Sequence, residues 1–256
     1  MDFTPPLLPG RLVRRYKRFL ADVEIEGRVE TVHCANPGSM MGLAEPGSRV
    51  WLSRSANAAR KLPLTWELVE ARGGLVGVNT AYGNRLAEEA LIHDRIPELA
   101  GYEVRRREVA YGEGSRIDFL LTHPGRPPCY LEVKSVTLAR AEAAEFPDAV
   151  TARGTRHLRE LVTMRRQGAR SVMLFLAQRG DCREFAVAAD IDPAYATALA
   201  AASAAGVEIL AYGCRVSPRA VALAGPLALP VALAAAAQLS GSSLLQNPAP
   251  GPLLRA

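Results

Sequence analysis

The stretch "CYLEVKSVTL", residues 129–138, combines an acid and a base with an otherwise apolar and β-branched run. Such a run predicts a buried strand. Side chains alternate between the two faces of a strand, so Glu132 and Lys134 share one face, whereas Leu131 and Val133 point to the other. A carboxylate and an ammonium on a buried strand contribute little to stability. The pair therefore predicts either an internal ion pair or a chemical site.

A second acid lies upstream, in "SRIDFLL" (residues 115–121). Thirteen residues separate Asp118 from Glu132, enough to finish one strand, turn and return beside it. An antiparallel pairing would place Asp118 next to Glu132 and Lys134. Adjacent carboxylates disfavour each other's ionisation, and a divalent cation relieves this conflict. Carboxylate oxygens favour Mg²⁺, with Mn²⁺ as the alternative, and Lys134 would then orient water and stabilise charge on a phosphoryl oxygen.

A helix is predicted before these strands, in "NTAYGNRLAEEALIHDRI" (residues 79–96). Glu88 and Glu89 lie on adjacent faces of this helix, so only one of them can face the sheet. We expect Glu89 to be the helix carboxylate of the site, because it lies beside the apolar positions of the helix. Asn84 either lines the same cleft or caps the helix. The candidate catalytic residues are Asp118, Glu132, Lys134 and Glu89, and the first two are the candidate metal ligands.

The order of the predicted elements indicates two domains of class α/β, or α+β overall. Between residues 10 and 80, short strands joined by glycine turns predict an OB-like β-barrel. From residue 81 the pattern is helix, three strands, helix, strand, helix, strand, which predicts an α/β domain with a mixed sheet and an initial meander. We expect the barrel over 1–80, the α/β domain over 81–231 and a flexible tail over 232–256.

Basic residues gather in a chain whose net charge is +5 and whose pI is near 9.2. The run "RLVRRYKR" (residues 11–18) places an aromatic among cations, which suits phosphate contacts and base stacking, although a solvated strand face is the alternative. The candidate nucleic-acid-binding residues are Arg11, Arg14, Arg15, Lys17, Arg18, Arg60, Lys61, Arg153 and Arg156. No helix-turn-helix pattern is visible, so we expect phosphate contacts with weak sequence preference.

The segment "FPDAVTARGTRHLREL" (residues 146–161) introduces a second helix. Asp148 and Thr151 precede it, and either or both can cap its first turn. The alternative is that this loop borders the cleft, with arginines of the helix meeting phosphates. Both possibilities stay open at the level of sequence.

Several other classes of protein are disfavoured by patterns that the sequence lacks. The four cysteines form no C-x-x-C pair, which predicts free thiols, and the four histidines lack the spacing of zinc ligands. The lack of a G-x-x-x-x-G-K motif argues against nucleoside triphosphate binding. We see neither a signal-peptide pattern nor a stretch that spans a bilayer, so we expect a cytoplasmic protein without a membrane partner. The oligomeric state stays open, and a homo-oligomer is compatible with the sequence.

The spacing D-x13-E-x-K, on a frame of helix, three strands, helix and strand, resembles the PD-(D/E)XK nuclease superfamily. More narrowly, residues 3 to 230 closely resemble the sugar fermentation stimulation protein A family of bacteria and archaea, through "RYKRFLADV", "HCANPGSM", "RKLPLTWELV", "SRIDFLL", "YLEVKSVTL", "FPDAVTARGTRHLREL" and "GVEILAY". The resemblance implies an OB-like domain before a nuclease-like domain. It also implies that Asp118 and Glu132 bind metal, that Lys134 is catalytic and that Glu89 is the helix carboxylate.

Two functions follow from this resemblance. One is Mg²⁺-dependent hydrolysis of single- or double-stranded DNA, and the other is a DNA-binding regulator linked to maltose metabolism that uses the same cleft without turnover. The chain departs from the family pattern at "HCANPG", where Ala35 and Pro37 stand in place of the expected proline and threonine. This departure leaves the role of the loop open.

Overall fold

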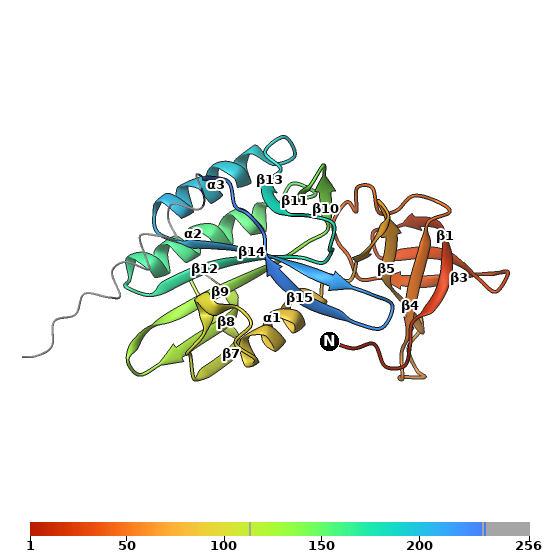
Figure 1. Ribbon diagram of the computed structural model, residues 1–256, viewed down its shortest axis with the longest axis horizontal. Coiled ribbons are helices and arrows are strands. Elements are labelled where there is room, and N and C mark those ends of the chain that lie inside the picture. Colours follow the sequence, from red (N-terminus) through yellow and green to blue (C-terminus); the bar gives the residue numbers. More distant parts are fainter. Residues whose placement is uncertain (113, 232, 234–256) are drawn as a thin grey trace, which may run out of the picture.

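The computed structural model describes residues 1–112, 114–231 and 233. It shows a β-barrel at the N-terminal end of the chain, followed by an α/β domain in which helices cover both faces of a sheet (Figure 1). No helix among these residues is long and apolar enough to cross a membrane. The predicted tail, residues 232–256, lies outside the described residues except for Leu233.

The N-terminal sheet contains β1 (Leu8–Tyr16), β2 (Leu20–Ile25), β3 (Arg28–Cys34), β4 (Arg49–Arg54), β5 (Leu64–Ala71) and β6 (Gly74–Gly77). Its strand order is β3-β2-β1-β4-β5-β6, and an additional parallel pairing between β3 and β5 closes the first five strands into a barrel. The barrel interior is filled by buried side chains that include Leu12, Val23, Val32 and Trp66. This closed five-stranded arrangement is the OB fold that the sequence predicts.

The second domain begins with α1 (Tyr82–Ile92) and the 3₁₀ turn η1 (Pro97–Leu99). Its strands and remaining helices are β7 (Val104–Tyr111), β8 (Ser115–His123), β9 (Arg126–Val136), β10 (Leu138–Arg140), β11 (Ala143–Phe146), α2 (Ala152–Arg166), β12 (Arg170–Ala177), β13 (Glu184–Val187), α3 (Pro193–Ala204), β14 (Glu208–Val216) and β15 (Val221–Pro226). The main sheet has the order β15-β14-β12-β9-β8-β7. Strands β7, β8 and β9 form the predicted antiparallel meander, and β12 runs parallel to both β9 and β14. The sheet is therefore mixed, as predicted.

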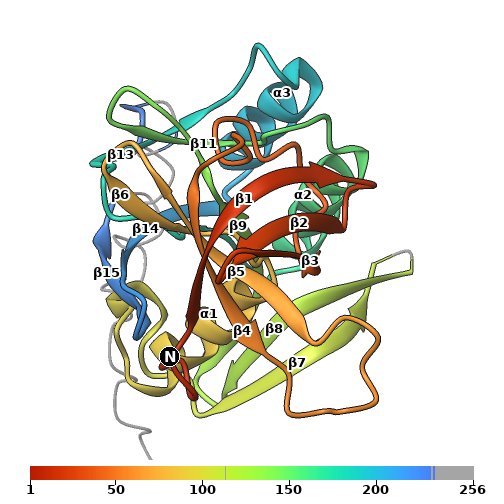
Figure 2. The ribbon, with the colours of Figure 1, turned by 90° about the vertical axis from the view of Figure 1, so that its right-hand side faces the viewer.

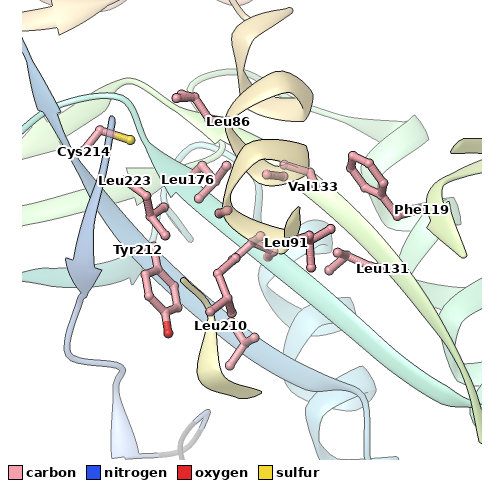
Figure 3. Packing of buried hydrophobic residues seen from close by; sticks show 14 of the residues in the cluster. Leu86, Leu91, Phe119, Leu131, Val133, Leu176, Leu210, Tyr212, Cys214 and Leu223 are labelled. Atoms are coloured by element: carbon pink, nitrogen blue, oxygen red, sulfur yellow. The ribbon is translucent and has the colours of Figure 1, made fainter. Parts of the chain in front are cut away.

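The helices bury both faces of this sheet. On one face α1 packs through Leu86 and Leu91 against a cluster that includes Leu131 and Val133 (Figure 3). On the other face α2 and α3 pack against the alternate side chains of the central strands. Helix α2 begins at the hydroxyl of Thr151, which accepts the N–H of Gly154 and so caps the helix.

Short elements account for the differences from the expected pattern. The strand expected over 129–138 breaks at Thr137, where the chain leaves the main sheet and forms a small sheet of β10, β11 and β13. These strands have three or four residues each and β15 pairs only at the sheet edge, so their periodicity is too short to detect. All four cysteines are free thiols, as predicted.

Candidate active site

The two predicted acids lie where β8 and β9 separate. The antiparallel ladder between these strands extends from the hairpin turn to the pair Phe119 and Leu131, and Asp118 is the next residue of β8. Its carboxylate accepts the N–H of Val133 at 2.8 Å, from the strand that carries the other two groups. The structure thus places Asp118 beside the segment 132–134, in the relation that the spacing predicts.

Glu132 and Lys134 point to the face of the sheet that α2 covers. Nζ of Lys134 donates to Oε1 of Glu132 at 2.6 Å, and the two side chains are only 16% and 3% exposed. Nδ1 of His157 on α2 donates to the same oxygen. Nε2 of His157 accepts from Nε of Arg153 at 3.3 Å, an arrangement that matches a ring proton on Nδ1. Glu132 is therefore held between a lysine of its own strand and a histidine of the helix.

One oxygen of this carboxylate is left without a partner. Oε2 of Glu132 is buried and accepts no hydrogen bond from the part of the chain that the structure describes. Among residues 1–112, 114–231 and 233, no group of three or more His, Cys, Asp or Glu side chains is arranged to hold a metal ion alone. Protein ligands for a cation at this point would come from two carboxylates, with the remaining positions taken by water or substrate.

The environments of the two acids move their pKa values in opposite directions. Burial raises the pKa of Asp118, and the nearby charge of Glu132 raises it further. Burial also raises the pKa of Glu132, but the hydrogen bond from His157 and the charge of Lys134 outweigh burial and hold it below its ordinary value. Paired acids with opposed shifts are typical of functional sites.

Helix α1 contributes an amide to this cluster and not the predicted carboxylate. Nδ2 of Asn84 donates to Asp118 at 2.7 Å, so Asn84 lines the site and does not cap the helix. The prediction that Glu89 belongs to this cluster is wrong. Its carboxylate instead binds the amino group of Met1 at 2.6 Å and the guanidinium of Arg95 at 3.9 Å. Five positions along an α-helix correspond to a rotation of about 140°, which points Glu89 away from the side occupied by Asn84.

His157 is a site residue that sequence reasoning did not identify. Its spacing was considered only for metal ligation, whereas in the structure its ring contacts the carboxylate of Glu132. The signal that could have found it is its position on the buried stripe of α2, between Gly154 and Leu161 and beside Leu158. A histidine on such a stripe must satisfy both ring nitrogens inside the protein.

The predicted nucleic-acid-binding residues divide into two groups. Arg11, Arg14 and Arg15 bind groups of the barrel itself, namely the carboxylate of Asp22 and carbonyl oxygens of neighbouring loops. Like Arg11 and Arg14, the others expose their side chains to solvent: Lys17, Arg18, Arg60, Lys61, Arg153 and Arg156. Lys17 and Arg18 occupy the β1–β2 turn, whereas Arg60 and Lys61 occupy the β4–β5 loop. The two loops lie close together, because Arg60 lies 3.3 Å from His33 at the end of β3 and His33 pairs with Leu20, the first residue after the β1–β2 turn.

The loop 36–40, whose role the sequence left open, joins the barrel to the α/β domain. The hydroxyl of Ser39 donates to the carbonyl of Asp148 at 2.5 Å, and the N–H of Met40 donates to the carboxylate of Asp148 at 3.1 Å. Gly38 permits this approach, because a Cβ atom there would lie 2.4 Å from that carboxylate. Asp148 therefore connects the two domains and does not cap α2.

A cleft of about 490 Å³ lies between the two domains, beside this connection. Arg18 and residues 36–38 line it from the barrel, and residues 145–153 line it from the α/β domain. Arg153 is shared between the cleft and the acidic cluster, since it lines the cleft and also donates to His157. Arg18 of the barrel and Arg153 of α2 therefore border the same cleft, and Arg153 also contacts His157 of the acidic cluster.

The fold and the site together define a two-domain protein in which an OB domain precedes an α/β domain with a mixed sheet. The model of the SfsA N-terminal OB domain matches residues 13–78, and the model of the sugar fermentation stimulation protein RE domain matches residues 81–220. The chain belongs to the sugar fermentation stimulation protein family.

Relatives of similar length support this assignment. The sugar fermentation stimulation protein homolog of Paramagnetospirillum magneticum is 53% identical over 230 residues, which cover 90% of this chain and 98% of that protein. The homolog of Rhodospirillum centenum is 57% identical over 220 residues, which cover 85% and 94%. The structure of Pyrococcus furiosus SfsA in complex with Ca²⁺ superposes with a TM-score of 0.82 at 29% identity and covers 90% of this chain and 98% of that one.

Proposed function

We propose that this chain is a divalent-metal-dependent phosphodiesterase that hydrolyses DNA. The proposal rests on one observation: Asp118, Glu132 and Lys134 meet where β8 and β9 separate, and a buried oxygen of Glu132 accepts no hydrogen bond from the described residues. An unpartnered buried carboxylate oxygen is costly to the folded state. A cation held by the two carboxylates would offset this cost, and the buried oxygen would then serve as a metal ligand.

The residues present fit a hard cation, Mg²⁺ or alternatively Mn²⁺. Mg²⁺ is usually bound by one or two carboxylates together with water and substrate phosphates, so Asp118 and Glu132 suffice without a third acid. The Pyrococcus furiosus relative is a complex with Ca²⁺, which also prefers oxygen ligands. When bound, such an ion lowers the pKa of a water molecule and offsets the charge of a phosphoryl group.

The side chains around the two acids would hold the reacting groups in place. Lys134 uses one N–H donor on Glu132 and has two more for a water molecule or a phosphoryl oxygen. His157 fixes the orientation of Glu132, and Asn84 fixes that of Asp118. Preorganised donors of this kind stabilise developing charge without further rearrangement.

Cleavage of end-labelled DNA, single-stranded and duplex, tests the proposal. We expect wild-type protein to cleave with Mg²⁺ or Mn²⁺ and not with EDTA, and we expect Asp118→Asn and Glu132→Gln to lose at least about 100-fold in rate. Glu89→Gln, a change to an acid outside the cluster, is the matched control and should retain the wild-type rate. The proposal is refuted if the wild-type protein is inactive with both cations, or if Asp118→Asn cleaves as fast as wild type.

A DNA-binding regulator without turnover, linked to sugar metabolism, is the second candidate. The observation that favours it is that Lys17, Arg18, Arg60 and Lys61 are exposed on loops of the barrel, where they can bind phosphates whether or not chemistry follows. Binding through phosphates weakens steeply as salt rises. Strong salt dependence together with an inactive wild-type protein would identify this second function.

A further inference from the structure

We infer that the substrate is single-stranded DNA, which runs from the basic loops of the barrel through the interdomain cleft to the acidic cluster. The inference rests on the proposed function and specifies its substrate. The cleft volume of about 490 Å³ lies within the range of small-ligand sites. A site of this size has room for a short segment of one strand, whereas a B-DNA duplex, whose major groove alone is about 12 Å wide, is a much larger object.

The contacts between the domains keep the cleft narrow. Ser39 and Met40 of the barrel both hydrogen-bond to Asp148 of the α/β domain, and Asp148 itself and Gly38, the residue before Ser39, line the cleft. A wider opening would break these two hydrogen bonds and move Gly38 away from the same carboxylate, which it now approaches closely. Preformed narrow walls therefore select one strand over two.

The walls of the cleft carry cations from both domains. Arg18 extends from the β1–β2 turn, and Arg153 extends from the first turn of α2, whose positive end also faces the cleft. Two carboxylates line the cleft as well, but Glu145 is paired with Arg140 and Asp148 accepts the loop N–H described above. Arg18 and Arg153 form no ion pair with residues 1–112, 114–231 or 233, so their charge remains available for the phosphates of a strand.

An aromatic side chain stands where a base would stack. Phe19 follows Arg18 in the β1–β2 turn, is 45% exposed, and is the one aromatic among the exposed large hydrophobic side chains of the described residues. Charged grooves combined with exposed aromatics are the general means of binding single strands, and OB barrels bind them beside the loops that follow their first and fourth strands. In Figure 2 the β1–β2 turn, the β4–β5 loop and α2 lie on the same, right-hand side of the molecule. A strand on this side can contact the barrel loops and reach α2.

Fluorescence anisotropy with a labelled 15-nucleotide single strand and with the same sequence in a blunt duplex tests the inference. Measurement in EDTA prevents turnover, so the result does not depend on whether the protein cleaves. We expect the wild-type protein to bind the single strand at least about tenfold more tightly, and Phe19→Ala to weaken that binding about 5- to 150-fold, as for loss of one stacked base. Phe19→Tyr should restore it.

Val29→Ala is the matched control, because Val29 is 62% exposed near the opposite end of the β2–β3 hairpin. Its affinity should equal that of wild type. Equal or tighter binding of the duplex, or an unchanged affinity in Phe19→Ala, overturns the inference. A protein that cuts duplex as fast as single strands would keep the proposed phosphodiesterase function and lose only the single-strand assignment.

Discussion

Replacement of Lys134 by methionine removes one of the two donors that hold the buried carboxylate of Glu132. Nζ lies 2.6 Å from Oε1, and at an effective dielectric constant of about 20 two such charges attract by about 6 kcal/mol. Part of this energy is recovered because the variant does not have to desolvate an ammonium. Removal of one partner from a buried pair typically costs about 3–5 kcal/mol. Since His157 still donates to the same oxygen, we expect about 3 kcal/mol at pH 7, or a fall in Tm of about 6–12 °C.

The pH dependence of this loss separates charge from packing. In wild type the folded pKa of Glu132 lies below its ordinary value of 4.5, so Glu132 contributes stability that is present above that value and is lost as pH falls through the folded pKa. Without Lys134 the pKa of Glu132 rises, because burial is then opposed by His157 alone. The variant takes up its proton at higher pH, and its difference in Tm from wild type should shrink between pH 7 and pH 4.

Thermal unfolding followed by circular dichroism measures this difference. Lys61→Met, which replaces an exposed lysine, is the matched control and should shift Tm by less than about 2 °C. The double variant Glu132→Gln/Lys134→Met removes both charges and should regain most of the stability lost by Lys134→Met. Equal losses at pH 7 and pH 4, or a double variant no more stable than the single one, would show that the cost comes from packing.

Two further changes test the surroundings of the site. Asp118→Asn should increase the free energy of unfolding at pH 7 by about 1 kcal/mol and so raise the Tm. Burial and Glu132 raise the pKa of Asp118 above its ordinary 3.8, so the protonated acid stabilises the fold at low pH and that contribution is lost as pH rises through the folded pKa. The gain should disappear when thermal unfolding is measured near pH 3.5, and a gain that persists there would contradict this cause. Gly38→Ala should cost about 1–3 kcal/mol, because its Cβ would meet the carboxylate of Asp148. Asp148→Ala in the same chain should relieve much of that loss, and strictly additive effects in denaturant unfolding would contradict the contact.

The sequence was sufficient for those parts of the site that depend on strand geometry. Side chains of a strand alternate strictly, so the relation of Glu132 to Lys134 followed from their spacing, and the short connection to Asp118 allowed only a hairpin. Helix faces were harder to assign. Whether Asn84, Glu88 or Glu89 faces the site depends on how α1 is rotated against the sheet, and this rotation is set by Leu86 and Leu91 packing onto strands that are distant in sequence.

The contact between the domains could not be predicted for a related reason. Asp148 precedes a helix, where an acid usually caps, and only the folded chain shows that loop 36–40 has reached it across more than a hundred residues. The helix is capped by Thr151 instead. When a residue can either cap a nearby helix or bind a distant loop, the tertiary structure decides between the two roles, and the local sequence pattern does not show which is taken.

Two buried glutamates in this chain show why only one of them is suited to a ligand. Glu67 in the barrel is 2% exposed, and each of its oxygens accepts a hydrogen bond, one from Ser53 and one from Asn79. Glu132 is equally buried, yet both of its donors in the described structure crowd one oxygen and leave the other without a partner. Burial raises the pKa of Glu67, and no lysine or histidine counteracts it among its described hydrogen-bond partners.

This contrast predicts where a divalent cation will stabilise the fold. A ligand that binds the native state at one hundred times its Kd adds about 2.7 kcal/mol, so saturating Mg²⁺ or Mn²⁺ should raise the Tm of the wild-type protein by about 5–10 °C. Glu132→Gln should abolish this rise, whereas Glu67→Gln should lower the starting Tm and keep the rise. Differential scanning calorimetry with and without the cation measures both. If the two variants respond alike, the bare oxygen of Glu132 is not the ligand, because the cation would then bind at a place that neither glutamate controls.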